Sequence, residues 1–227
     1  MSKLPASKSD VDHFLARAKT AKAPALRSTH RIIFALDATA SRAPTWDLAC
    51  SLHDELFNAA RDAGNIAVQL VYYRGIDGFN YTEWSTTPAS LLARMSTVRC
   101  LGGRTQILRV IRHARAQAAA HPVKAVVFVG DCFEEDQDRV AAAAGELAVY
   151  GTPMFIFQEG GDRVAGQVFR YLADITRGAH VPFSDGSADE LRILLRAVAA
   201  YASEGRAGLQ RHLSNPLVKR LLTQLDP

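Results

Sequence analysis

The chain has 227 residues, 48% of them hydrophobic and 22% charged, a composition typical of a globular protein with a sizeable core. This composition excludes the disordered, collagen-like and disulfide-scaffold classes. The formal net charge is +4, but the charges are unevenly spread. Residues 1–31 contribute +5 and residues 205–227 contribute +3, so a mildly acidic body of −4 lies between two basic ends.

Membrane and secretory signals are missing from the sequence. No run approaches the roughly 18 apolar residues of a membrane span, and the charged N-terminus does not resemble a secretory signal. Cys50, Cys100 and Cys132 are widely spaced and form neither CxxC pairs nor an even disulfide set. They indicate reduced thiols. We therefore expect a cytoplasmic protein with no membrane partner.

The chain divides into three predicted segments. Residues 1–29 form a basic N-terminal extension, in which residues 8–22 are expected to be helical. The body, residues 30–203, alternates apolar runs typical of buried strands with segments of helical periodicity. Strands are expected at 32–36, 66–73, 125–129, 154–157 and 180–183, and helices at 45–63, 106–120, 137–149, 162–176 and 187–203.

The body has one departure from strict alternation. Asp77-Gly78 favours a turn, and Phe79, Tyr81 and Trp84 indicate a short strand that returns beside 66–73. The whole pattern predicts an α/β fold: a doubly wound, mostly parallel six-stranded sheet with helices on both faces and one antiparallel edge strand. Pro182 indicates that the strand at 180–183 lies at the other edge.

The third segment, residues 204–227, is a basic amphipathic tail. It places leucines at a four-residue step, interrupted by Asn215-Pro216. Such a segment either packs against the body or binds a partner or another copy of the chain. The leucines are Leu209, Leu213, Leu217, Leu221 and Leu225.

Oxygen-bearing side chains occur in three predicted loops of the body. Asp37, Thr39 and Ser41 come directly after the first strand, and their alternate spacing lets them converge on one point. Thr105 follows Gly102-Gly103, and Asp131 follows the strand at 125–129. In a doubly wound sheet the carboxyl ends of the strands form the ligand site. Two carboxylates and three hydroxyls suit Mg²⁺ or Mn²⁺ better than zinc.

Here the sequence resembles the von Willebrand factor A family. That family's metal-ion-dependent adhesion site takes an Asp-x-Ser-x-Ser loop, a threonine from a glycine-bearing loop and an aspartate after the fourth strand. Asp37, Thr39, Ser41, Thr105 and Asp131 occur in the same order. Thr39 replaces the usual first serine, and Cys132 stands beside Asp131 where a glycine is common.

The resemblance implies a metal-ion-dependent protein-binding domain with no catalytic activity. A Glu or Asp of a partner protein would complete the coordination of a bound Mg²⁺ or Mn²⁺, and an ATPase-linked or assembly complex would supply that partner. Glu134, Glu135, Asp136 and Asp138 either form a second ion site or occupy a helix N-terminus.

Two alternatives remain open at this point. The same carboxylates are compatible with a metal-assisted hydrolase, although no His or Lys falls in the three candidate loops. A metal-free scaffold that recognises partners through its tails is the other alternative. Nucleotide binding is disfavoured because the Gly102-Gly103 loop lacks the Gly-Lys-Ser/Thr pattern, and no strongly basic groove for nucleic acid is evident.

Overall fold

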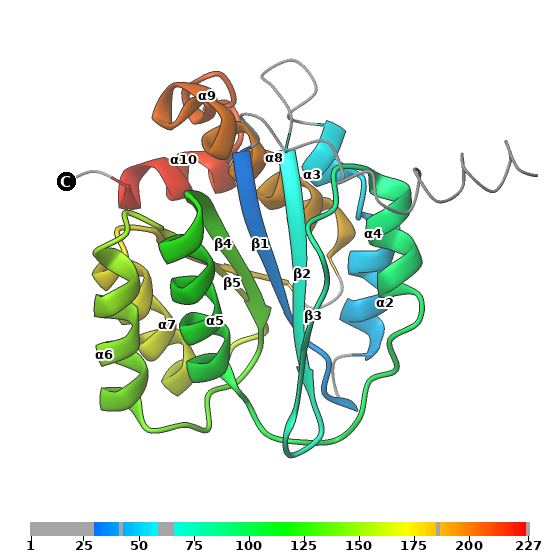
Figure 1. The fold of residues 1–227 in the computed structure, drawn as a ribbon. Coiled ribbons are helices and arrows are strands. Elements are labelled where there is room, and N and C mark those ends of the chain that lie inside the picture. Colours follow the sequence, from blue (N-terminus) through cyan, green and yellow to red (C-terminus); the bar gives the residue numbers. More distant parts are fainter. Residues whose placement is uncertain (1–29, 41–42, 59–65, 185–186, 226–227) are drawn as a thin grey trace, which may run out of the picture.

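The structure, a computed structural model, describes residues 30–40, 43–58, 66–184 and 187–225. A six-stranded sheet has the order β3-β2-β1-β4-β5-β6, and only the β2–β3 pair is antiparallel. The predicted sheet and both predicted edge strands are confirmed, whereas residues 1–29 lie outside the described part. The strands are β1 (His30–Asp37), β2 (Ile66–Arg74), β3 (Gly78–Tyr81), β4 (Val123–Gly130), β5 (Met154–Glu159) and β6 (Ala179–Phe183) (Figure 1).

Helices cover both faces of the sheet, as the continuous apolar strands predict. Along β1, Ile32 and Phe34 belong to one core and Ile33 and Ala35 to the other. The first core contains α2 (Ala43–Ser51), α3 (Glu55–Asn58), α4 (Pro88–Met95) and α8 (Ala188–Glu204); the second contains α5 (Ile107–Ala120), α6 (Gln137–Ala148) and α7 (Arg163–Ile175).

No helix in the described ranges is long and apolar enough to cross a membrane.

The single helix predicted over 45–63 is wrong in its middle. Helix α2 ends at Ser51, and α3 begins only at Glu55. The hydroxyl of Ser51 donates to the carbonyl of Leu48 at 2.7 Å, and Nδ1 of His53 lies 2.8 Å from the carbonyl of Cys50. Side chains that bind nearby carbonyls compete with the helical ladder, which explains the interruption. Residues 59–65 lie outside the described part.

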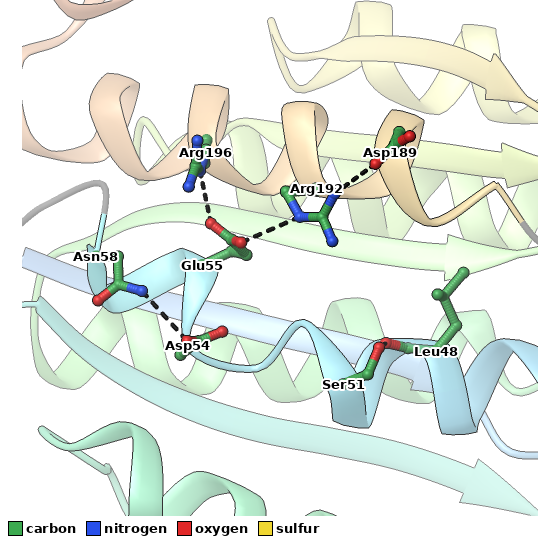
Figure 2. A network of polar contacts seen from close by, with 8 residues as sticks. All are labelled: Leu48, Ser51, Asp54, Glu55, Asn58, Asp189, Arg192 and Arg196. Atoms are coloured by element: carbon green, nitrogen blue, oxygen red, sulfur yellow. Dashed lines mark hydrogen bonds and ion pairs between the residues drawn. The ribbon is translucent and has the colours of Figure 1, made fainter.

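Glu55 joins α3 to α8 through a buried carboxylate. Its side chain is 10% exposed and accepts from Nε of Arg192 at 3.2 Å and from Nε of Arg196 at 2.5 Å (Figure 2). Arg192 also pairs with Asp189 one turn earlier in α8. The two guanidinium groups offset the desolvation of the carboxylate, so this contact fixes α8 over the first core.

The C-terminal segment packs on the body. It forms α9 (Arg206–Gln210) and α10 (Pro216–Gln224). The interruption predicted at Asn215-Pro216 is the start of α10. Asn215 caps α10 by accepting from the Leu217 amide at 2.9 Å. Leu209 and Leu221 are fully buried in the core that α8 lines, whereas Leu213 is 42% exposed. The predicted bounds of the three segments remain a prediction.

Gln224 covers the edge of β6. Its Oε1 accepts from the His180 amide at 2.9 Å, and its Nε2 donates to the His180 carbonyl, also at 2.9 Å. The side-chain amide therefore bonds to an edge strand as a neighbouring strand would. An unpaired edge is a template for association, and this contact blocks it locally.

We expect Gln224→Ala to lower the free energy of unfolding by about 1–2 kcal/mol, because two hydrogen bonds are lost at a partly buried edge. Hydrogen exchange should accelerate at the His180 amide, whose acceptor is removed. Gln210→Ala, on the exposed side of α9, is the matched control and should change neither quantity. Unchanged exchange at His180 in the Gln224 variant would contradict this assignment.

Candidate metal centre

The candidate centre lies where the strand order of the sheet reverses. Strand β1 pairs with β2 on one side and with β4 on the other, so the chain leaves the ends of β1 and β4 in different directions. Asp37 is the last residue of β1, and Asp131 directly follows β4. In open α/β sheets this switch point is the usual ligand site.

Asp37 is held rigidly at the end of β1. It is 3% exposed, and its Oδ1 accepts from the Thr39 amide at 2.8 Å. Its Oδ2 accepts from the hydroxyl of Tyr73 at 3.1 Å. Tyr73 is the residue of β2 that pairs with Asp37 in the sheet. Both carboxylate oxygens are therefore oriented by contacts from neighbouring elements.

A second carboxylate and a thiol lie beside Asp37. Oxygen and sulfur atoms of Asp37, Asp131 and Cys132 all lie within 4.8 Å of one another, a spacing that allows them to share a metal ion. Burial raises the pKa of Asp37, and the nearby Asp131 raises it further, against the lowering effect of the hydrogen bonds from Thr39 and Tyr73. Two acids at this distance repel each other when both are ionised, and a cation between them would relieve that repulsion.

Without a bound cation, Cys132 is a thiol at neutral pH. Burial raises the pKa of this thiol to about 12, and the neighbouring Asp131 contributes to the shift. The two carboxyl groups supply the oxygen donors of the group. The donor set therefore fits a hard divalent cation such as Mg²⁺ or Mn²⁺.

The glycine-rich loop is fastened between β1 and the β2–β3 turn. The Leu101 amide donates to the carbonyl of Ala38 at 3.0 Å, and the Gly75 amide donates to the carbonyl of Leu101 at 3.2 Å. A Cβ atom on Gly103 would lie 1.9 Å from the carbonyl oxygen of Gly75, whereas one on Gly102 would meet nothing within 4 Å. Glycine is thus required at 103 by the close approach of the two backbones.

Thr105, at the end of this loop, contacts the segment that follows Asp131. Its hydroxyl accepts from the Glu134 amide at 3.1 Å, and its own amide donates to Oε2 of Glu134, also at 3.1 Å. Glu135 continues the contact by accepting from the amides of Ile107 and Leu108. Both glutamates therefore occupy the N-terminus of α5, while Asp136 caps α6.

The structure thus places four of the five predicted ligands. Asp37 and Asp131 come together, Thr39 lies 8% exposed beside Asp37, and Thr105 contacts the loop of Asp131. Ser41 lies outside the described residues. No contact or distance shows that all five bind one ion, so the complete ligand set remains a prediction.

Tyr73 is a site residue that the sequence pattern missed, and Glu159 is a buried acid at the end of β5 that it also missed. Tyr73 could have been found by aligning the ends of the two predicted strands, because its pairing with Asp37 follows from that register. Glu159 ends β5, is 5% exposed and accepts from the hydroxyl of Thr45 in α2. This contact fixes the start of the helix that follows the Ser41 loop, and no local motif announces it.

Comparison with known proteins identifies the fold. The structure is similar to a von Willebrand factor type A protein from Catenulispora acidiphila (TM-score 0.63, 16% identity, 78% of this chain and 43% of that one). It is also similar to the SpRpn10 VWA domain (0.60, 12%, 74% and 94%). A third similar structure is the manganese-loaded Plasmodium vivax TRAP protein (0.54, 12%, 74% and 72%).

These likenesses show that the chain has the von Willebrand factor A fold, as the resemblance in its sequence implies. No family model and no curated protein matches the sequence. The chain spans less than half the length of the Catenulispora protein. Because the identities are low, the comparison establishes the fold, and the function must be argued from the site.

Proposed function

We propose that this chain binds a divalent cation, Mg²⁺ or Mn²⁺, at the ends of β1 and β4 and through it captures an acidic side chain of a partner protein. The observation that carries the proposal is the group formed by Asp37, Asp131 and Cys132, whose ligand atoms lie within 4.8 Å of one another at the switch point of the sheet. The proposed ligands are Asp37, Thr39, Ser41, Thr105 and Asp131.

The residues around the two carboxylates support a site prepared for a cation. Thr39 and Tyr73 hold both oxygens of Asp37, and Glu134 ties Thr105 to the loop of Asp131. Such outer contacts orient metal ligands and strengthen binding. When bound, the ion supplies positive charge and a coordination position that a carboxylate can fill.

The hydrogen bonds that the nearby acids accept favour a binding role over catalysis. Glu134 and Glu135 are the nearest candidates for a general base in the loop after β4, yet both accept hydrogen bonds from the start of α5. The described parts of the three candidate loops contain no His or Lys. Hydrolysis would require a base within reach of the reacting water.

Structures that share the fold agree with a binding role. One is a pilus adhesin from Lactobacillus rhamnosus GG, and another is a human COPII-coat protein. The TRAP structure was determined loaded with manganese. These properties belong to those proteins, and they favour for this chain a partner within an assembly, of which an ATPase-linked complex is one kind.

We expect the wild-type chain to retain partner proteins from native lysate in Mg²⁺ and to lose most of them in EDTA. Asp37→Asn should fail to retain them in either condition, because it removes a ligand charge while preserving the size of the side chain. Glu146→Gln, which neutralises an exposed acid paired with Arg115, is the matched control and should behave as wild type. Identical partners in Mg²⁺ and EDTA would contradict metal-dependent capture.

A further inference from the structure

The β2–β3 turn and the glycine-rich loop form one continuous surface beside the candidate centre. Gly75 and Leu101 are joined by a backbone hydrogen bond of 3.2 Å, and the Arg104 amide donates to the Gly75 carbonyl at 3.3 Å. The Leu101 amide in turn donates to Ala38, the residue that follows Asp37. Figure 1 shows both connections at the same end of the sheet. The surface is therefore continuous with the candidate centre.

Two large apolar side chains are exposed on this surface. Ile76 is 76% exposed and Leu101 is 51% exposed. Leu101 is one of the two residues whose backbone hydrogen bond joins the loops, and Ile76 directly follows the other, Gly75. Exposed apolar side chains on two hydrogen-bonded loops offer apolar contact area to a partner protein.

Two arginines accompany these apolar side chains. Arg99 and Arg104 are exposed, and neither guanidinium group forms an ion pair or hydrogen bond with any residue in the described ranges. Two other arginines brace the loops instead. Arg74 donates to the Arg99 carbonyl at 2.9 Å, and Arg109 donates to the Asp77 carbonyl at 2.9 Å.

Acids near this surface differ in what they contact. Glu134 and Glu135 accept hydrogen bonds from backbone amides at Thr105, Ile107 and Leu108, and Asp77 is exposed beside Ile76 in the β2–β3 turn. The segment from Arg99 to Thr105 contains two arginines and no acid. Arg99 and Arg104 therefore give an acidic partner segment a preferred position on the side of the glycine-rich loop.

We propose that Ile76, Arg99, Leu101 and Arg104, here called the arginine rim, bind the residues that flank the metal-bound acid of the partner. The inference rests on the proposed function and specifies its partner: a segment in which the acid that reaches the centre has an apolar residue and a second acid nearby. The apolar residue packs on Ile76 and Leu101. The second acid pairs with Arg99 or Arg104, and the rim thereby selects among acidic segments.

The test uses the full chain and fluorescein-labelled twelve-residue peptides on a Gly-Ser background. One peptide carries a single Glu, and the others add a Leu and a second Glu one to four positions away on either side. Fluorescence anisotropy gives the Kd of each in Mg²⁺ and in EDTA. The variants are R99E/R104E and I76S/L101S. Their controls are K219E/R220E on α10, with the same change of charge, and V149S/L213S, which alters two other exposed apolar residues.

We expect the best two-acid peptide to bind about fivefold more tightly than the single-Glu peptide in Mg²⁺. R99E/R104E and I76S/L101S should each remove most of that preference, and both controls should keep it. If both rim variants keep the preference, or if wild type has none, the inference is overturned while metal-dependent binding of the single-Glu peptide still supports the proposed function. Equal affinities in Mg²⁺ and EDTA, or no binding by any peptide, overturn both.

Discussion

Replacing Asp37 by asparagine should abolish the thermal stabilisation that Mg²⁺ or Mn²⁺ gives the wild-type chain. A ligand present at one hundred times its Kd stabilises the folded state by about 2.7 kcal/mol, which raises the Tm of a chain of this size by about 5–10 °C. Asparagine preserves an acceptor for the Thr39 amide and a partner for the Tyr73 hydroxyl, so the fold should persist. Differential scanning calorimetry with and without the ion measures this shift.

The same substitution should stabilise the metal-free chain at neutral pH. Burial and the proximity of Asp131 raise the pKa of Asp37 in the folded state, so the ionised carboxylate costs folding free energy above that raised pKa. As the pH falls through it, wild-type Asp37 takes up a proton and the penalty disappears. The stability advantage of Asp37→Asn should therefore shrink on acidification.

The control for the Asp37 variant is Glu146→Gln, which loses an exposed ion pair on α6. An exposed pair contributes only about 0–1 kcal/mol, and this variant should keep the full metal-induced shift. A metal-induced shift in Asp37→Asn as large as that of wild type would contradict the role of Asp37 as a ligand.

Gly103→Ala should destabilise the chain by about 3 kcal/mol, because the new methyl group would collide with backbone atoms of Gly75. The collision would separate the glycine-rich loop from the β2–β3 turn and displace Thr105. We therefore also expect the affinity for Mn²⁺ to fall by at least about tenfold. Chemical denaturation measures the first effect, and isothermal titration with MnCl₂ measures the second.

Gly102→Ala provides a control one residue away. A methyl group at this position meets no atom within 4 Å, and the backbone of Gly102 does not have a positive φ. We expect a change of stability below about 0.5 kcal/mol and an unchanged affinity. Equal effects of the two alanine variants would show that the close approach of Gly103 to Gly75 does not fix the loop.

The architecture of the sheet follows from the sequence because each strand is a continuous apolar run. Ile32–Leu36 is buried on both faces, and such runs are hard to place anywhere except in a covered parallel sheet. Pro182 marked the edge strand correctly, since an edge tolerates a missing amide. The order of the oxygen-bearing residues along the sequence indicates the von Willebrand factor A fold.

Short helices were harder to predict. Helix α4 has only eight residues, and its start depends on the cap formed by Thr87 and Pro88. The break after Ser51 depends on side chains that bind nearby carbonyls. Both features are decided by a few local hydrogen bonds rather than by hydrophobic periodicity, which dominates a reading of the sequence.

The candidate centre was predictable only in outline. Asp37 and Asp131 could be placed at adjacent strand ends, because parallel strands end on one edge of the sheet. The contacts of Glu134 and Glu135 with the start of α5 could not be predicted, because the bonded residues are 27 to 29 positions apart in the sequence. Contacts at that separation depend on the packing of the whole fold rather than on a local pattern.

The most direct test of the metal centre is a crystal structure of the chain grown with MnCl₂, with anomalous differences recorded at the manganese edge. We predict an anomalous peak between the carboxylates of Asp37 and Asp131, with oxygen ligands at the distances typical of Mn²⁺. Crystals of Asp37→Asn grown with the same MnCl₂ should lack the peak. A map without density at this position, or with its only peak beside Asp136 and Asp138, would contradict the proposal that the ends of β1 and β4 hold the ion.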